Sequence, residues 1–171
     1  MAEIRVLRIG HRPDRDKRVT THTALTARAL GAKAVLVDAK DNKLEENVRS
    51  VVDRFGGDFS IETGVQWRKV LREFDGKIAH LTMYGMRVDE AVPLLQDEDL
   101  LVVVGAEKVP PEVYQLATVN VSVGNQPHSE IAALAIFMDR LTEGRSLYEE
   151  RGGRMKVIPN ERGKTVIDSS K

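Results

Sequence analysis

The segment from residue 99 to residue 141 constrains the fold more than any other part of this chain. It contains two apolar runs, Leu100 to Val104 and Thr118 to Val123, and each is followed by a loop that contains glycine. Such β-branched runs are typical of strands buried on both faces of a parallel sheet. The second loop leads directly into a helical pattern. We therefore expect two neighbouring strand ends beside a helix N-terminus, where open sheets bind small molecules.

The two helices of this segment have recognisable beginnings. Pro110 and Pro111 can start a short helix, because a proline at the first helical position lacks only an N–H that would have no partner there. Ser129 or Asn125 can cap the next helix, and Glu130 then lies in its first turn, where the helix dipole favours a negative charge.

Strand and helix patterns alternate over the rest of the chain. Strands are predicted at residues 3–9, 34–37, 59–61 and 77–81, and helices at residues 20–30, 42–55, 65–74 and 89–95. Thr20 or Thr21 is expected to cap the first helix, and residues 82–85 are expected to form a loop after the fourth strand. This alternation predicts an α/β fold with a mostly parallel sheet flanked by helices.

The pattern changes after Leu141, where glycines and basic residues dominate. Residues 155–158 and 165–167 can pair as a β-hairpin. A chain of 171 residues is long enough for one hydrophobic core. We expect one domain over residues 1–143 and a basic extension over residues 144–171, which either contacts a substrate or stabilises a dimer.

Composition excludes several classes of protein. The chain has no cysteine, so it has no disulfide or thiolate zinc site, and its histidines lack the spacing of metal ligands. No apolar run is long enough to span a membrane, and charges near the N-terminus do not fit a signal peptide, so we expect a cytoplasmic protein. The net charge is zero, so nucleic acid would bind a local patch, and DNA binding is not expected. The GxGxxG, P-loop and GxSxG motifs are absent.

Basic residues crowd the stretch after the first strand, which itself is expected to have a basic face. They are Arg8, Arg12, Arg15, Lys17 and Arg18. One interpretation is a solvated loop with ion pairs to Asp14 and Asp16. The other is a grip for phosphate or ribose, because guanidinium groups match phosphate oxygens.

Three segments are expected to converge if their strands are neighbours: residues 81–85, 105–109 and 123–130. Their backbone groups can then contact a flat, mostly uncharged ligand such as adenosine, and glycine lets the backbone approach it closely. The alternative is that each glycine merely ends a strand.

The motifs of these segments resemble a known family. GAEKVP (105–110) and GNQPHSEIAALAIFMDRL (124–141) resemble motifs two and three of the SPOUT methyltransferases, specifically the archaeal tRNA 2′-O-ribose methyltransferases that modify the T-loop cytidine at position 56. RIGHRPDRDKRVTTHTALTARALGA (8–32) resembles motif one. In motif three, residues 120–122 match by letters and residues 127–129 match by their position before the helix; we prefer the second register.

The resemblance implies a deep trefoil knot within about residues 78–143, which holds S-adenosylmethionine in a bent shape. Knots are rare, and nothing in periodicity predicts one. The implied cofactor contacts are Leu81, Gly105, Ala106, Glu107, Lys108, Val109, Val123, Gly124, Asn125, Gln126, Pro127, His128, Ser129 and Glu130.

The resemblance also implies a reaction, a substrate and an assembly. The ribose 2′-hydroxyl of tRNA must be positioned and deprotonated, and Arg18 is our first choice for that role, with Arg12 or Arg15 gripping the flanking phosphate. His22 is the alternative base, because imidazole exchanges protons near neutral pH. A homodimer is expected, with each site built from both chains. Two other hypotheses stay open: a noncatalytic RNA-binding module, and an enzyme that binds another adenine nucleotide at the same loops.

Overall fold

A computed structural model describes residues 2–106 and 108–171, and its centre is one parallel sheet of six strands in the order β3-β2-β1-β5-β4-β6. The strands are β1 (Ile4–Ile9), β2 (Ala34–Val37), β3 (Ser60–Thr63), β4 (Lys77–Arg87), β5 (Leu100–Gly105) and β6 (Val119–Ser122). The three segments expected to converge follow or interrupt β5, β4 and β6, which lie side by side. The prediction of an α/β fold with a mostly parallel sheet is confirmed.

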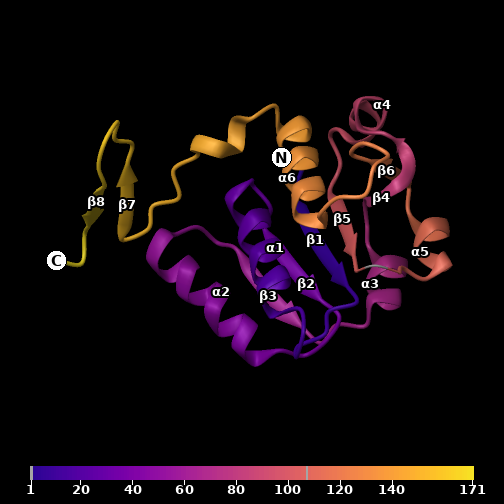
Figure 1. Cartoon of the computed structure of the whole chain (residues 1–171), viewed down its shortest axis with the longest axis horizontal. Coiled ribbons are helices and arrows are strands. Elements are labelled where there is room, and N and C mark those ends of the chain that lie inside the picture. The colour runs from indigo at the N-terminus through magenta and orange to yellow at the C-terminus, as the bar shows by residue number, and fades with distance from the viewer. Residues whose placement is uncertain (1, 107) are drawn as a thin grey trace.

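Helices cover both faces of this sheet (Figure 1). One face carries α1 (Lys17–Ala29), α2 (Asn42–Phe55), α4 (Val88–Ala91) and α6 (Glu130–Thr142). The other face carries α3 (Trp67–Glu73) and α5 (Pro111–Leu116). Two short 3-10 helices, η1 (Val92–Leu95) and η2 (Arg145–Tyr148), follow α4 and α6. None of the helices in the described part of the chain combines the length and apolar character needed to cross a bilayer.

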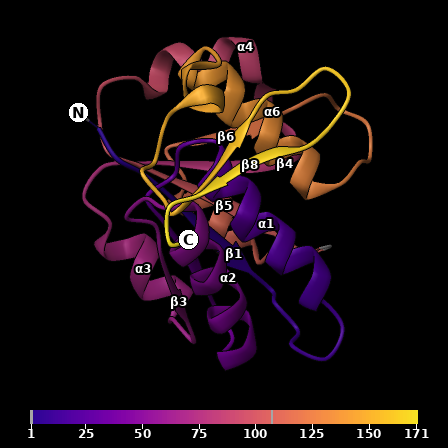
Figure 2. The ribbon, with the colours of Figure 1, turned by 90° about the vertical axis from the view of Figure 1, so that its left-hand side faces the viewer.

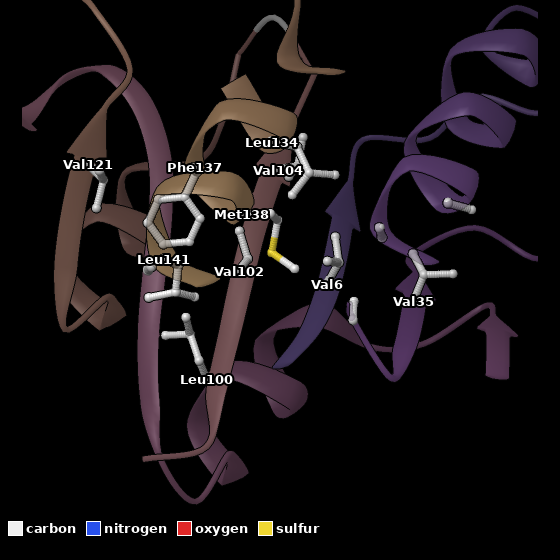
Figure 3. Packing of buried hydrophobic residues seen from close by; sticks show 14 of the residues in the cluster. Val6, Val35, Leu100, Val102, Val104, Val121, Leu134, Phe137, Met138 and Leu141 are labelled. Carbon is white, nitrogen blue, oxygen red and sulfur yellow. The ribbon is translucent and has the colours of Figure 1, made fainter. Parts of the chain in front are cut away.

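The apolar run of β5 joins the two layers of the core. Val102 and Val104 pack on the face covered by α6, whereas Leu101 and Val103 pack on the face covered by α3 and α5. Figure 3 shows the first face, where Phe137 of α6 lies against the strands. Alternate residues of a strand point to opposite faces, so a fully apolar run is what a central strand requires.

Two predictions about the N-terminal part were wrong. Helix α1 begins at Lys17, not after Thr20 or Thr21, and Thr20 is fully buried inside it. Strand β1 has no basic face: Arg5 is exposed, whereas Arg8 is 1% exposed. The physical reason is spacing, because residues three apart on a strand point to opposite faces. Arg8 therefore does not belong to the basic loop.

Strand β4 was expected to end at Leu81, but it continues to Arg87 after an interruption. Leu81 and Met86 both pair with Val121 of β6, so residues 82–85 leave the ladder between them. The chain therefore makes an excursion where a loop was expected and then returns to the same neighbour. This excursion lies at the edge of the sheet that carries the glycine loops.

The C-terminal part of the chain lies beside the sheet rather than in it. Strands β7 (Met155–Ile158) and β8 (Thr165–Asp168) pair antiparallel; they lie to the left of α2 in Figure 1 and in front of the other elements in Figure 2. The attachment point is a bridge between Gly56 and Gly152. Arg151 reinforces it by donating to the carbonyl oxygens of Arg28 and Ala29 at the end of α1.

Candidate active site

A cavity of about 520 Å³ lies where β4, β5 and β6 turn into their loops, between the N-terminal ends of α1 and α6. Its volume is within the range of pockets that hold drug-sized ligands. Twelve of the residues singled out from the sequence line it: Arg12, Leu81, Gly105, Ala106, Val109, Val123, Gly124, Gln126, Pro127, His128, Ser129 and Glu130. The structure thus brings together the three segments that sequence motifs indicated.

Other residues singled out from the sequence do not line this cavity. Lys108 and Asn125 are exposed beside it, and Glu107 lies outside the described residues. Arg15, Arg18 and His22 are exposed around the start of α1 and do not line the cavity of their own chain. Within one chain, therefore, only Arg12 of the four proposed catalytic residues reaches the site.

Sequence reasoning gave several other lining residues no place at the cavity: Asp16, Val19, His80, Tyr114 and Ala133. The cavity is also lined by Arg8 of the basic stretch and by Thr82, Met83 and Tyr84 of the segment expected to converge. A signal existed for His80, a polar residue inside an apolar strand. Burial lowers the pKa of His80, its Nδ1 lies 2.9 Å from Asn120 Oδ1, and its ring meets Tyr114 edge-on. Tyr114 could not be found in this way, because its place depends on how α5 packs.

Close packing at two glycines shapes the cavity. A Cβ atom on Gly105 would lie 2.1 Å from Val109 Cγ2, and one on Gly10 would lie 2.9 Å from Ala106 Cβ. Gly10 also has a φ of +85°, which other residues rarely adopt. Glycine is therefore required at residue 10, where the loops after β1 and β5 approach each other, and at residue 105, where the loop after β5 folds back on its own Val109.

The start of α6 is built as its sequence predicts. Ser129 is the N-cap, and its side chain accepts a hydrogen bond from the Ile131 N–H at 3.1 Å. Ser122, by contrast, is buried in β6 and donates to the Met86 carbonyl. Of the two possible registers for motif three, only residues 127–129 stand at the helix entrance that opens on the cavity.

Hydrogen bonds hold the loop of residues 123–129 against β4 and against itself. Asn125 donates from Nδ2 to the Met83 carbonyl at 2.6 Å. His128 places Nε2 2.6 Å from the Val123 carbonyl and Nδ1 3.0 Å from the Ser129 carbonyl. Both ring nitrogens can donate only when the imidazole is protonated. The carbonyls of Ser129 and Val123 accordingly raise the pKa of His128.

These two contacts of the His128 ring, which we call the His128 clamp, predict a pH dependence of stability. A raised pKa in the folded state stabilises the fold below the ordinary value of 6.5, and the contribution disappears as pH rises through the folded value. The difference in unfolding free energy between the wild type and His128→Gln should therefore shrink from about pH 5.5 to about pH 8.5. Chemical denaturation across this range measures it, and a difference that is independent of pH would contradict the clamp.

The loop after β1 is anchored to the ends of β2 and α2. The N–H groups of Gly10 and His11 donate to the two carboxylate oxygens of Asp38 at 2.7 and 3.0 Å. The buried ring of His11 lies between Asp41 Oδ2 at 2.8 Å and Thr20 Oγ1 at 2.6 Å. These contacts fix the path of the chain toward Arg12.

We expect Asp41→Ala to lower the free energy of unfolding by roughly 2 kcal/mol, because it removes a helix cap and leaves a buried histidine without its partner. Asp41 Oδ1 accepts from the Leu44 N–H. Burial raises the pKa of Asp41, but the bonds from His11 and Leu44 outweigh it and hold the pKa below 3.8. The stabilisation is therefore present above pH 3.8 and is lost as pH falls through the folded value.

The matched control is Asn42→Ala, the exposed neighbour, with an expected change below about 0.5 kcal/mol. Urea denaturation of the three proteins measures the differences. Equal stability of Asp41→Ala and Asn42→Ala would show that the buried contacts of Asp41 contribute nothing.

Arg12 and Asp16 form an ion pair at the wall of the cavity. Arg12 donates from Nε and Nη2 to the two carboxylate oxygens of Asp16 at 3.0 and 3.1 Å. The Arg12 guanidinium thereby lowers the pKa of Asp16. The ion pair expected of a solvated loop therefore exists, but it borders the cavity. Among the described residues, no group of acidic and histidine side chains can hold a metal ion.

Comparison with known proteins decides the family. A family model described as "tRNA ribose 2'-O-methyltransferase, aTrm56" matches residues 55–167, which include β4, β5, β6 and the whole of α6. The chain belongs to this family. Membership explains why the glycine loops and the helix entrance at Ser129 occur together around one cavity.

Two relatives in this family align over nearly their whole length. The chain is 57% identical to the tRNA (cytidine(56)-2'-O)-methyltransferase of Methanothrix thermoacetophila, covering 96% of this chain and 97% of that protein. It is 56% identical to the protein of the same name from Thermococcus kodakarensis, covering 96% of each. Both alignments therefore span almost the whole of this chain.

A solved structure shares the fold at low sequence identity. The SpoU methyltransferase AviRb from Streptomyces viridochromogenes, solved in complex with the cofactor AdoMet, superposes with a TM-score of 0.59 at 17% identity. The match covers 82% of this chain and 57% of that one. Fold similarity to a SpoU protein extends the resemblance beyond the archaeal relatives.

Proposed function

We propose that this chain transfers a methyl group from S-adenosylmethionine to the ribose 2′-hydroxyl of cytidine 56 in the T loop of tRNA. The observation that carries the proposal is the cavity at the ends of β4, β5 and β6, in a chain 57% identical to a protein named for this reaction. The similarity to this relative indicates the substrate, and the cavity is the site at which we place the reaction.

The lining of the cavity fits S-adenosylmethionine. The loops at Leu81, Gly105 and Gly124 offer backbone groups and close approach, which suits a flat adenosine. Residues 81, 105–109 and 123–130 would hold the cofactor. When bound, it supplies an activated methyl group on a sulfonium.

We assign the topology around this cavity to a trefoil knot within about residues 78–143, inside one domain of residues 1–143. The fold shared with a SpoU protein supports this assignment. Residues 144–171 are then an extension, consistent with a hairpin whose strands pair only with each other.

The 2′-hydroxyl is a weak nucleophile at neutral pH, so the protein must position it and accept its proton. In our proposal Arg18 polarises or deprotonates this hydroxyl, and Arg12 or Arg15 binds the flanking phosphate, for which guanidinium geometry is suited. His22 is the alternative base. Arg18 and His22 are four residues apart in α1, so they share one face of the helix.

The positions of these residues support the homodimer that we propose. Arg15, Arg18 and His22 are exposed outside the cavity of their own chain, so they serve catalysis only if they reach the cavity of a second copy. Exposed apolar side chains, Tyr84 at the cavity and Ile136 on α6, are consistent with such contact. The partners are thus tRNA and a second copy, in the cytoplasm, without DNA or membrane.

The proposal is tested by incubating the protein with S-adenosylmethionine labelled in its methyl group and an unmodified tRNA transcript. Label should enter the RNA. Titration with S-adenosylhomocysteine, ATP and NAD tests the alternative that the chain is an enzyme for another adenine nucleotide. Our proposal predicts that only S-adenosylhomocysteine binds. A noncatalytic RNA-binding module would bind tRNA in a salt-dependent way and leave it unlabelled.

A further inference from the structure

Arg8 is a buried cation at the cavity that the roles above do not use. Its side chain is 2% exposed and it lines the cavity from β1. Its Nη1 lies 3.2 Å from Glu130 Oε1, yet neither Nη1 nor Nε has a hydrogen-bond partner among the described residues. The two charges are therefore adjacent, while the N–H groups on Nε and Nη1 remain without a hydrogen-bond acceptor among the described residues.

Donors that are buried without partners are rare, because each one costs the free energy of its lost hydration. Asp16 lines the same cavity, and the charges of Arg12, chiefly, and of Arg8 lower its pKa. These acids compensate the charge of Arg8 but leave its Nε without an acceptor. A ligand that brings a hydrogen-bond acceptor into the cavity would supply the partner that these N–H groups of Arg8 lack.

We propose that Arg8 and Glu130 together bind the amino-acid end of the cofactor, with Arg8 binding its carboxylate and Glu130 its ammonium. The proposal rests on the proposed function, because S-adenosylmethionine carries this zwitterion. An arginine beside a glutamate, with Nη1 and Oε1 3.2 Å apart, presents the complementary pair of charges. Glu130 is one-third exposed and Arg8 is deep, so the carboxylate lies on the inner side.

The depth of Arg8 selects among anions. A phosphate within a polynucleotide is bulky on both sides, and a guanidinium that is 2% exposed offers it no approach. The terminal carboxylate of a small molecule already in the cavity meets no such obstacle. Charge-assisted bonds from a desolvated arginine are among the stronger polar contacts, so the carboxylate should dominate affinity for this end of the cofactor.

The test compares three ligands by calorimetry: S-adenosylhomocysteine, its decarboxylated analogue, and 5′-methylthioadenosine, which lacks the whole amino-acid end. The wild type should bind S-adenosylhomocysteine roughly 30-fold more tightly than the decarboxylated analogue. Arg8→Met should abolish this preference and leave the affinity for 5′-methylthioadenosine unchanged. Glu130→Gln should weaken S-adenosylhomocysteine while sparing 5′-methylthioadenosine.

Arg5→Met is the matched control, because Arg5 lies on the same strand but is exposed and paired with Glu3. It should change none of the affinities. If Arg8→Met proves unstable, two measurements still test the inference: the preference of the wild type for S-adenosylhomocysteine over the decarboxylated analogue, and the affinities of Glu130→Gln. A wild type that binds S-adenosylhomocysteine without preferring its carboxylate, or an Arg8→Met that weakens only tRNA binding, overturns this inference alone. A wild type that binds none of the three ligands overturns the proposed function as well.

Discussion

Arg18→Ala is expected to lower the single-turnover rate of methyl transfer at least about 100-fold, while the affinity for S-adenosylhomocysteine stays unchanged. In our proposal Arg18 acts on the 2′-hydroxyl in the cavity of a second copy; it is exposed and does not line the cavity of its own chain, so its removal should leave cofactor binding there intact. Quenched-flow transfer to tRNA and calorimetry measure the two quantities. Arg49→Ala, an exposed arginine on α2, is the control and should change the rate less than about twofold.

Mixing two inactive variants tests whether Arg18 acts in the second subunit. Gly105→Val places side-chain atoms where a Cβ already meets Val109 at 2.1 Å, so it should block the cavity. A heterodimer of Arg18→Ala and Gly105→Val retains one site with an open cavity and an intact Arg18 from the other chain. Statistical mixing should restore about one quarter of wild-type activity. A dimeric mixture without recovery would mean that Arg18 acts within its own chain or not at all.

The second large effect is expected at Gly85, which ends the excursion of β4. A Cβ atom there would lie 2.4 Å from the carbonyl carbon and oxygen of Asn120 and 2.5 Å from the Val121 nitrogen. These are backbone atoms of β6, which cannot move aside without opening the sheet. We expect Gly85→Ala to lower the free energy of unfolding by about 1–3 kcal/mol.

The same substitution should weaken S-adenosylhomocysteine binding, because Thr82, Met83 and Tyr84 of the excursion line the cavity. Gly163→Ala is the matched control: neither glycine has a positive φ, and a Cβ on Gly163 meets nothing closer than 3.6 Å. Urea denaturation should find this control unchanged or slightly more stable. If both variants lose the same stability, the close contact between β4 and β6 is not the cause.

Local patterns predicted much of the fold because local chemistry determines it. The β-branched run of β5 is apolar on both faces, as a central strand must be, and Ser129 caps α6 because its hydroxyl accepts from a free N–H. Pro111 begins α5 for a similar local reason. The glycine loops were recognised from their motifs, and parallel strand ends necessarily meet at one edge of the sheet.

Long-range contacts decided what the sequence could not predict. Arg8 looks like part of a basic loop until Glu130, far along the chain, is placed beside it. Thr20 looks like a helix cap, but its hydroxyl contacts the buried His11, and α1 begins earlier. The excursion of β4 depends on pairing with β6, which is invisible in the local pattern of residues 77–87.

The position of the methyl group in tRNA tests the central claim most directly. The protein is incubated with S-adenosylmethionine and two tRNA transcripts that differ only in carrying cytidine or 2′-deoxycytidine at position 56, and nuclease fragments are weighed by mass spectrometry. We predict one added methyl group on the ribose of cytidine 56 and none on the deoxy transcript. Methylation at another nucleotide, or equal methylation of both transcripts, would contradict the assignment of cytidine 56 and its 2′-hydroxyl as the substrate.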